Sequence, residues 1–167
     1  MTDSLRLADD GDLHLVLRWR NHPQVRAVSL TNHEISLAEH TAWWARVQAD
    51  PDRTLLLHLH RGVPSGVVNF AGITSPEAAL TWGFYLDIAG LDERAELLPA
   101  WMSLQRAAIA YAFDTLGAET LGGETLATNK PVLALHRRFG FRVVRQYERD
   151  IDGKPHQVVW TEMSRGK

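Results

Sequence analysis

The stretch ETLATNKPVLALHRRFGF, residues 124–141, carries side chains that could do chemistry. His136 is its only titratable group with an ordinary pKa near neutrality, so it could accept or donate a proton. Val132 and Phe139 fall on the same face of the expected helix, and there they would desolvate the imidazole and favour its neutral form. The alternative is a half-buried helix histidine whose hydrogen bond serves only the fold.

Two further polar residues frame this helix. Glu124 ends the preceding strand and could act as a general base, directly or through water. It could equally be an exposed carboxylate at a strand end. Asn129 stands at the break before the helix, where asparagine is a strong N-cap.

A second polar set lies in the N-terminal third of the chain. Arg20 and Arg26 suit a nucleotide diphosphate, because a guanidinium group binds phosphate as a planar fork. His40 lies beside two tryptophans whose faces could stack on a base or cover a sugar. His33 and Glu34 form another candidate acid–base pair. The plainer interpretation of this set is a solvated arginine face, a helix histidine and tryptophans that anchor the core.

Composition excludes several classes of function. The net charge of −2 argues against broad nucleic-acid binding, which needs a basic surface. Cysteine is absent, so no thiolate metal site or cysteine nucleophile exists, and we expect no metal. No apolar run approaches the roughly 20 residues of a membrane span, and the N-terminus lacks an apolar signal core, so a cytoplasmic protein is expected.

Hydrophobic periodicity and turn residues predict the elements that must position these side chains. A capping box of Ser36 and Glu39 should open the second helix, and Pro23 should end the first. Strands are predicted over residues 4–10, 53–62, 63–74, 78–90, 118–127, 141–150 and 154–163, and helices over 11–23, 35–52, 97–117 and 130–139. This order of antiparallel strands and helix crossovers predicts an α+β (mixed α/β) fold, with helices packed on one sheet.

Three segments resemble one enzyme family. TWGFYLDIAG is similar to the fourth strand of the GNAT acyltransferases where it runs into the cofactor loop. Residues 124–141 match the family's fifth strand and following helix, in which an asparagine is followed about seven residues later by a tyrosine and then by Gly-Phe. The resemblance covers most of the chain, residues 1–167, as a single GNAT domain. It implies a central, mostly antiparallel sheet of about seven strands flanked by about four helices.

The N-terminal segment resembles a narrower group, the acetyltransferases of pseudaminic acid biosynthesis. These carry Trp-Arg-Asn-x-x-x-Val-Arg and then Ile-Ser-x-x-x-His-x-x-Trp. The matching residues here are Trp19, Arg20, Asn21, Val25, Arg26, Ile35, Ser36, His40 and Trp43.

The resemblance implies acetyl transfer from acetyl-CoA to an amine, here the 4-amino group of a UDP-linked 4-amino-4,6-dideoxy-N-acetyl-altrosamine. It places His136 where many GNAT enzymes keep a tyrosine general acid beside the sulfur. Backbone groups of the fourth strand would bind the pantetheine and the developing oxyanion. The implied cofactor contacts are Phe84, Tyr85, Leu86, Asp87, Arg94 and Asn129, and the implied substrate contacts are Arg20, Asn21, Arg26, His40 and Trp82.

The segment DIAGLDERAELLPAW departs from the family pattern. Most GNAT enzymes carry there Gln or Arg, two residues, Gly, one residue, and Gly or Ala, and this loop wraps the CoA pyrophosphate with backbone N–H groups. This chain has the single glycine Gly90, followed by Asp92, Glu93 and Glu96, and only Arg94 is basic. A diphosphate would be repelled by these carboxylates.

Three readings of the loop remain open. Arg94 and the amides of residues 95–97 could still hold phosphate. Donor binding could be weak, or could use Lys130, Arg137 and Arg138 of the last helix. The protein could also use another acyl donor, or be a binding module on the same scaffold.

Other acceptors also remain open: the amine could belong to a protein N-terminus or to another small molecule such as an antibiotic. In each case we expect the partner to be a small-molecule or peptide amine, and we expect no binding to nucleic acid or to a membrane. The fold also admits a homodimer.

Overall fold

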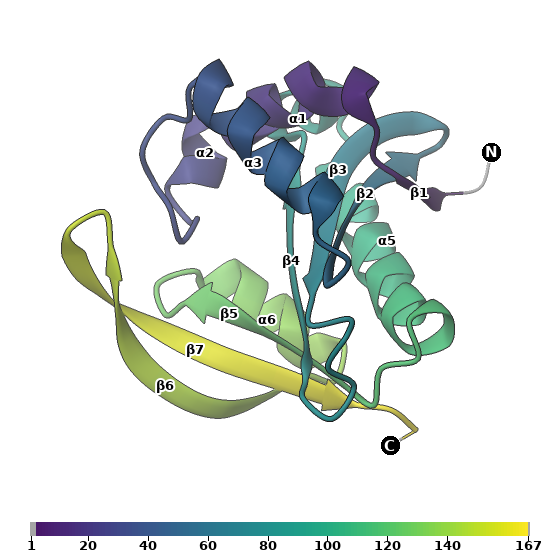
Figure 1. Cartoon of the computed structure of the whole chain (residues 1–167), viewed down its shortest axis with the longest axis vertical. Helices are drawn as coiled ribbons and strands as arrows, with labels where there is room; N and C mark the ends of the chain where they lie inside the picture. The colour runs from purple at the N-terminus through teal and green to yellow at the C-terminus, as the bar shows by residue number, and fades with distance from the viewer. Residues whose placement is uncertain (1–2, 167) are drawn as a thin grey trace.

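The computed structural model of the chain describes residues 3–166 and contains one seven-stranded sheet. The strand order is β1-β2-β3-β4-β5-β7-β6, and every neighbouring pair is antiparallel except β4 and β5 (Figure 1). The expected α+β class is therefore confirmed. The strands are β1 (Ser4–Leu7), β2 (Arg53–His60), β3 (Val63–Ala71), β4 (Leu80–Leu86), β5 (Thr120–Leu126), β6 (Arg142–Ile151) and β7 (Lys154–Ser164).

Helices cover both faces of the sheet. One layer packs on Leu55 and Leu57, and the other packs on Leu56 between them, because successive side chains of a strand point to opposite faces. The first layer holds α1 (Leu13–Arg20), α2 (Pro23–Arg26) and α3 (Leu37–Ala49), after the short turn η1 (Asp10–Asp12). The second holds α4 (Ile88–Glu93), α5 (Leu97–Ala110) with its final turn η2 (Tyr111–Thr115), and α6 (Lys130–Arg138).

Six α-helices appear in the described part of the chain, where about four were expected. Pro23 opens α2 instead of only ending α1, since proline is well suited to the first position of a helix. Asp87 accepts a hydrogen bond from the backbone N–H of Gly90 at 3.0 Å and so caps α4, within the segment that was expected to form a phosphate loop. None of the helices described is long and apolar enough to cross a membrane.

The parallel pair β4–β5 separates soon after it forms. The two strands are in register only at Leu80 with Leu121 and at Thr81 with Gly122. A side chain at Gly123 would meet the backbone oxygen of Trp82 at 2.7 Å, so glycine lets β5 pass close to β4 at the point of divergence. Beyond it, the β5-facing edge of β4 has no strand partner. The two strands therefore diverge and leave a wedge-shaped opening. Backbone groups of β4 that have no strand partner line it.

Candidate active site

His136 lies on α6, buried against the wedge between β4 and β5. The residue is 4% exposed, and its ring centroid lies 5.5 Å from Trp82, 6.2 Å from Phe84 and 5.1 Å from Phe141. Neither ring nitrogen has a hydrogen-bond partner within the described residues. Burial lowers the pKa of His136 to about 4. The imidazole is therefore neutral near pH 7, which agrees with the neutral form expected from the sequence.

Trp82 does not join the N-terminal arginines. Its side chain is buried and stacks on Phe84 and Phe141, on the side of the sheet that carries α5 and α6. Tyr85 projects to the opposite side, where it packs with the cluster under α1 and α3. The strand β4 thus separates two environments, a donor side around His136 and an acceptor side around Tyr85.

The backbone of β4 offers fewer groups than the sequence suggested. Residues 84–86 keep their β5-facing edge unpaired, which fits the role expected for the pantetheine arm. Asp87 is different, because its N–H donates to the carbonyl of Ser65 at 2.8 Å and its carboxylate caps α4. Because backbone groups alternate along a strand, Tyr85 pairs with Val67 of β3, and Phe84 and Leu86 face the open edge. The polar groups of Asp87 are occupied.

Asn129 begins α6, but its side chain makes no capping hydrogen bond. Only its backbone carbonyl takes part, as it accepts from Leu133 N–H at 3.2 Å. The expected N-cap by the side chain is wrong.

Glu124 is not an exposed strand end, and its carboxylate already has two partners. Tyr147 donates its hydroxyl to the Glu124 carboxylate at 2.5 Å, and Arg149 forms an ion pair with the same group. Burial, followed by this hydrogen bond, raises the pKa of Tyr147 to about 12. Tyr147 and Arg149 lie more than 20 residues along the chain from Glu124, and no local pattern pointed to them.

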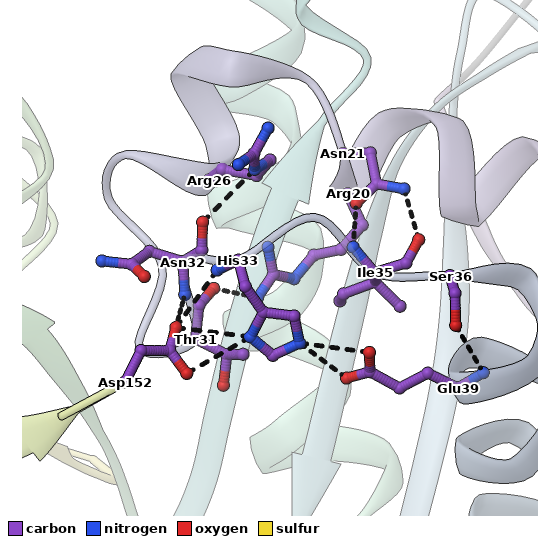
Figure 2. Close-up of polar contacts among 10 residues, drawn as sticks. All are labelled: Arg20, Asn21, Arg26, Thr31, Asn32, His33, Ile35, Ser36, Glu39 and Asp152. Atoms are coloured by element: carbon purple, nitrogen blue, oxygen red, sulfur yellow. Dashed lines mark hydrogen bonds and ion pairs between the residues drawn. The ribbon is translucent and has the colours of Figure 1, made fainter.

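The Arg20 guanidinium has a hydrogen-bond partner for Nη2 but, within the described residues, none for Nη1. Its Nη2 donates to the carbonyl of Thr31 at 2.6 Å, while its buried Nη1 has no partner among the described residues (Figure 2). Burial lowers the pKa of Arg20, and the nearby Tyr85 and Glu39 counteract this effect. One strong donor is thus available on the acceptor side.

Asn21 and Arg26 hold the loop formed by residues 27–36, which we call the strap. The Asn21 amide donates to the Ile35 carbonyl and accepts from the Ile35 N–H, both at 2.8 Å. Arg26 donates from Nε to the Asn32 carbonyl at 3.3 Å. Asn21 therefore has a structural role that uses its whole amide, whereas Arg26 keeps other donors free.

The strap is tied to the far end of the chain. Asp152, in the β6–β7 turn, accepts from the N–H groups of Asn32 and His33 at 2.8 and 3.1 Å. The His33 ring bridges Asp152 at 3.2 Å and Glu39 at 2.9 Å, as Figure 2 shows, and these carboxylates raise the pKa of His33, Glu39 most strongly. His33 thus pairs with Glu39 and Asp152, and the expected pair with Glu34 is wrong.

The second helix starts as predicted, with one difference. Ser36 Oγ accepts from the Glu39 N–H at 3.1 Å, which confirms it as the N-cap of α3. The Glu39 carboxylate binds His33 and does not close the capping box.

His40 lies in the core under α3. It is 3% exposed, its Nε2 lies 3.0 Å from the Leu13 carbonyl, and its ring stacks on Trp43. Burial lowers the pKa of His40, so the neutral ring donates this bond. Its Nε2 is thus occupied by the Leu13 carbonyl and is not a free substrate contact.

The loop before α5 fits a CoA pyrophosphate only in part. The N–H groups of Ala95 and Glu96 donate to Asp92 and Leu91 carbonyls, so they cannot hold phosphate as expected. No side chain caps α5, and its first N–H groups remain available. Arg94 lies within reach, but its Nε is 3.6 Å from the Glu96 carboxylate.

The basic residues of α6 lie elsewhere. Lys130 and Arg137 line a surface cavity of about 510 Å³ between α6 and the β6–β7 hairpin. This cavity is floored by Leu133 and Val159, not by β4. These two residues therefore do not replace the phosphate loop at the end of β4.

Comparison with known proteins adds an independent view of the chain. A family model described as an acetyltransferase (GNAT) domain matches residues 9–149. Among curated proteins, acetyltransferase PseH of Campylobacter jejuni subsp. jejuni serotype O:23/36 (strain 81-176) is 25% identical over 141 residues, which cover 84% of this chain and 82% of that protein.

Solved structures share the fold at lower identity. Spermidine N-acetyltransferase from Vibrio cholerae in complex with CoA and spermine has a TM-score of 0.81 at 16% identity, covering 99% of this chain and 96% of that one. Campylobacter jejuni PseH in complex with acetyl coenzyme A has a TM-score of 0.66 at 18% identity, covering 99% and 100%. With the wedge beside α6 and a family model that spans most of the sequence, the chain belongs to the GNAT family of N-acetyltransferases.

Proposed function

We propose that the protein transfers an acetyl group from acetyl-CoA to the amine of a nucleotide-linked amino sugar, of the UDP-4-amino-4,6-dideoxy type. The similarity to PseH over 84% of the chain supports this class of acceptor. The structural observation that supports the proposal concerns Arg20. Its buried Nη1 has no hydrogen-bond partner within residues 3–166. A buried, unpaired guanidinium N–H is costly, and a diphosphate oxygen would satisfy it.

On the acceptor side, charge and aromatic surface fit a nucleotide sugar. Arg26 and Arg20 flank the strap, and the Tyr85 ring lies within electrostatic reach of Arg20. The guanidinium of Arg145 lies 5.0 Å from the Trp160 ring, and Glu124 is opposite Trp160 in the sheet. A positively charged and aromatic surface of this kind can hold a diphosphate and a base.

On the donor side, acetyl-CoA would supply the reactive thioester. The free edge of β4 at residues 84–86 would bind the pantetheine arm and place N–H donors at the developing oxyanion. The neutral His136 would donate an N–H to the leaving sulfur, which a buried imidazole can do without being charged. Glu124 would accept the amine proton through water while it stays bound to Tyr147.

The test is a panel of amines with acetyl-CoA, followed by release of free thiol and by the mass of the acceptor. We expect turnover of a UDP-4-amino sugar and none of spermidine, aminoglycosides or a peptide N-terminus. Acetylation of one of those amines instead would replace the proposed acceptor. Absence of thiol release with every amine would favour a binding module.

Arg20→Gln tests the acceptor site directly. We expect KM for the UDP-sugar to rise by about 10- to 100-fold with little change in kcat, because a charged hydrogen bond to the acceptor is lost. Arg18→Gln is the matched control, since Arg18 is exposed on the same helix. Equal effects of the two substitutions would show that Arg20 acts only through net charge.

A further inference from the structure

A carboxylate of the chain itself lies at the start of α5, beside two guanidinium groups and an imidazole. Arg61 Nη1 is 3.1 Å from Glu96 Oε1, and both Arg94 Nε and His60 Nε2 are 3.6 Å from Glu96 Oε2. Glu96 is the N-cap residue of α5, yet its side chain does not cap the helix. The carboxylate is therefore held by arginines from two segments, the β2–β3 turn and the end of α4.

The imidazole in this group is buried and incompletely paired. His60 is 5% exposed, and its Nδ1 binds Asp3 at 2.5 Å. Its Nε2 is directed at Glu96 but has no hydrogen-bond partner among the residues described. Because Nδ1 faces the Asp3 carboxylate, it carries the N–H of the neutral ring and Nε2 is an acceptor. His60 therefore packs beside the Glu96 carboxylate without donating to it, and the arginines are the groups that hold Glu96.

The backbone at two positions brings Arg61 and Glu96 together. Arg61 and Gly62 form the two-residue loop between β2 and β3, and their φ values of 53° and 78° are those that such a hairpin turn requires. Ala95, directly before Glu96, has a φ of 56°, a left-handed conformation that is uncommon for a residue other than glycine. The turn presents Arg61 toward the start of α5, and Ala95 redirects the chain from α4 into α5.

The position matches that of the missing phosphate loop. Arg94 Nη2 reaches Ser65 Oγ at 3.4 Å, and the Ser65 carbonyl accepts the N–H of Asp87, which follows β4. The N–H groups of Leu97 and Leu98 open α5 and favour an anion, whereas Pro99 has no N–H to offer. Two guanidinium groups and these two N–H groups together form an anion site.

We propose that Glu96 is an internal counter-anion, which occupies this site until the pyrophosphate of the acyl donor displaces it. The inference rests on the proposed use of acetyl-CoA for the identity of the ligand, but not for the existence of the anion site. Arg61 is 67% exposed and its contact with Glu96 is an ion pair screened by solvent, so this arginine can exchange the carboxylate for a more highly charged anion. Arg61 and Arg94 would then bind phosphate in place of the glycine-rich loop.

The test measures binding of CoA and of inorganic pyrophosphate by calorimetry, without any acceptor. Glu96→Gln keeps the shape of the side chain but removes its charge, and we expect both ligands to bind about tenfold more tightly. Glu93→Gln is the matched control, because Glu93 is an exposed neighbour that carries the same charge. We expect the control to change either affinity by less than about twofold.

Each outcome separates the two proposals. If both variants and the wild type bind CoA equally well, Glu96 is not a competitor and this inference falls, while the donor assignment stands. If only pyrophosphate binds, and Glu96→Gln tightens it, the anion site stands and acetyl-CoA falls. Arg94→Gln gives a second measure should Glu96→Gln fold poorly: weaker binding of both ligands supports the site, and unchanged binding overturns it.

Discussion

Two histidines on opposite sides of the sheet are equally buried but differ in their partners. His40, on α3, is 3% exposed and its Nε2 lies 3.0 Å from the Leu13 carbonyl. His136, on α6, is 4% exposed, packs among aromatic rings, and has no hydrogen-bond partner within residues 3–166. Burial alone therefore does not separate a structural histidine from a functional one. The unsatisfied ring nitrogens make His136 the better candidate for contact with a ligand.

Two carboxylates repeat this contrast. Asp152 accepts from two backbone N–H groups at 2.8 and 3.1 Å and joins the strap to the β6–β7 turn. Within residues 3–166 the Glu96 carboxylate receives no backbone donor, and Arg61 and Arg94 hold it at 3.1 and 3.6 Å. The first arrangement serves the fold, and the second suits a group that must move.

The largest effect should come from His136→Phe. Transfer should slow by about 10²-fold, because the leaving sulfur loses its hydrogen-bond donor. The unfolding free energy should rise by about 1–2 kcal/mol, because two buried unpaired nitrogens are removed. Single-turnover rates under saturating donor and urea unfolding measure the two quantities. An unchanged rate would remove His136 from the chemistry.

Acid should destabilise the donor side over a defined pH window. The folded pKa values of His136 and His58 are lowered from 6.5 to about 4, chiefly by burial. Between these values the unfolded chain binds more protons, so stability falls as the pH drops from about 6.5 to about 4, by up to about 3 kcal/mol for each histidine.

Urea midpoints across this pH range measure the effect, and His136→Phe should flatten the slope. His33 supplies a contrast, because its pKa is raised by Glu39 and Asp152. Its contribution to stability is present at lower pH and is lost as the pH rises through the folded pKa. A slope that His136→Phe leaves unchanged would show that the ring is not protonated on unfolding in this window.

His40→Phe should give the opposite result to the same substitution at His136. The new ring keeps the stack on Trp43 but leaves the Leu13 carbonyl without its side-chain donor, so the protein should lose about 1 kcal/mol. The transfer rate should stay the same. A loss of rate with unchanged stability would restore His40 to the acceptor site.

The smallest effect should come from Asp152→Asn. Asparagine tolerates the φ of 48° found at this position and keeps an oxygen acceptor, but it loses the charge that His33 contacts. Hydrogen exchange at the amides of Asn32 and His33 should become faster, with CoA affinity unchanged. Unchanged exchange would mean that the strap is held by other contacts, such as the Asn21 amide.

Patterns within single segments of the sequence predicted the individual helices and strands. Helix periodicity located α6, and the resemblance of its motif to the GNAT family placed His136 beside the cofactor site. The order of elements correctly predicted the α+β sheet. The helix α4 was missed because one side-chain cap, from Asp87 to Gly90, turns an acidic loop into a helix.

Contacts between distant segments could not be read from the chain. Asp152 binds His33 across 119 residues, and Arg61 meets Glu96 across 35. Tyr147 and Arg149 reach Glu124 only because β6 and β5 both flank β7. The sequence offered the donors and acceptors but not their pairing.

The amino-acid sequence by itself determined the class of fold, the family and the residue types available at the site, because these depend on periodicity and spacing within single elements. The tertiary structure alone decided which of two buried histidines is satisfied, which carboxylate is fixed and which arginine keeps a free donor. Hydrogen bonding and burial set those properties, and both depend on which segments, far apart in the chain, the sheet brings into contact.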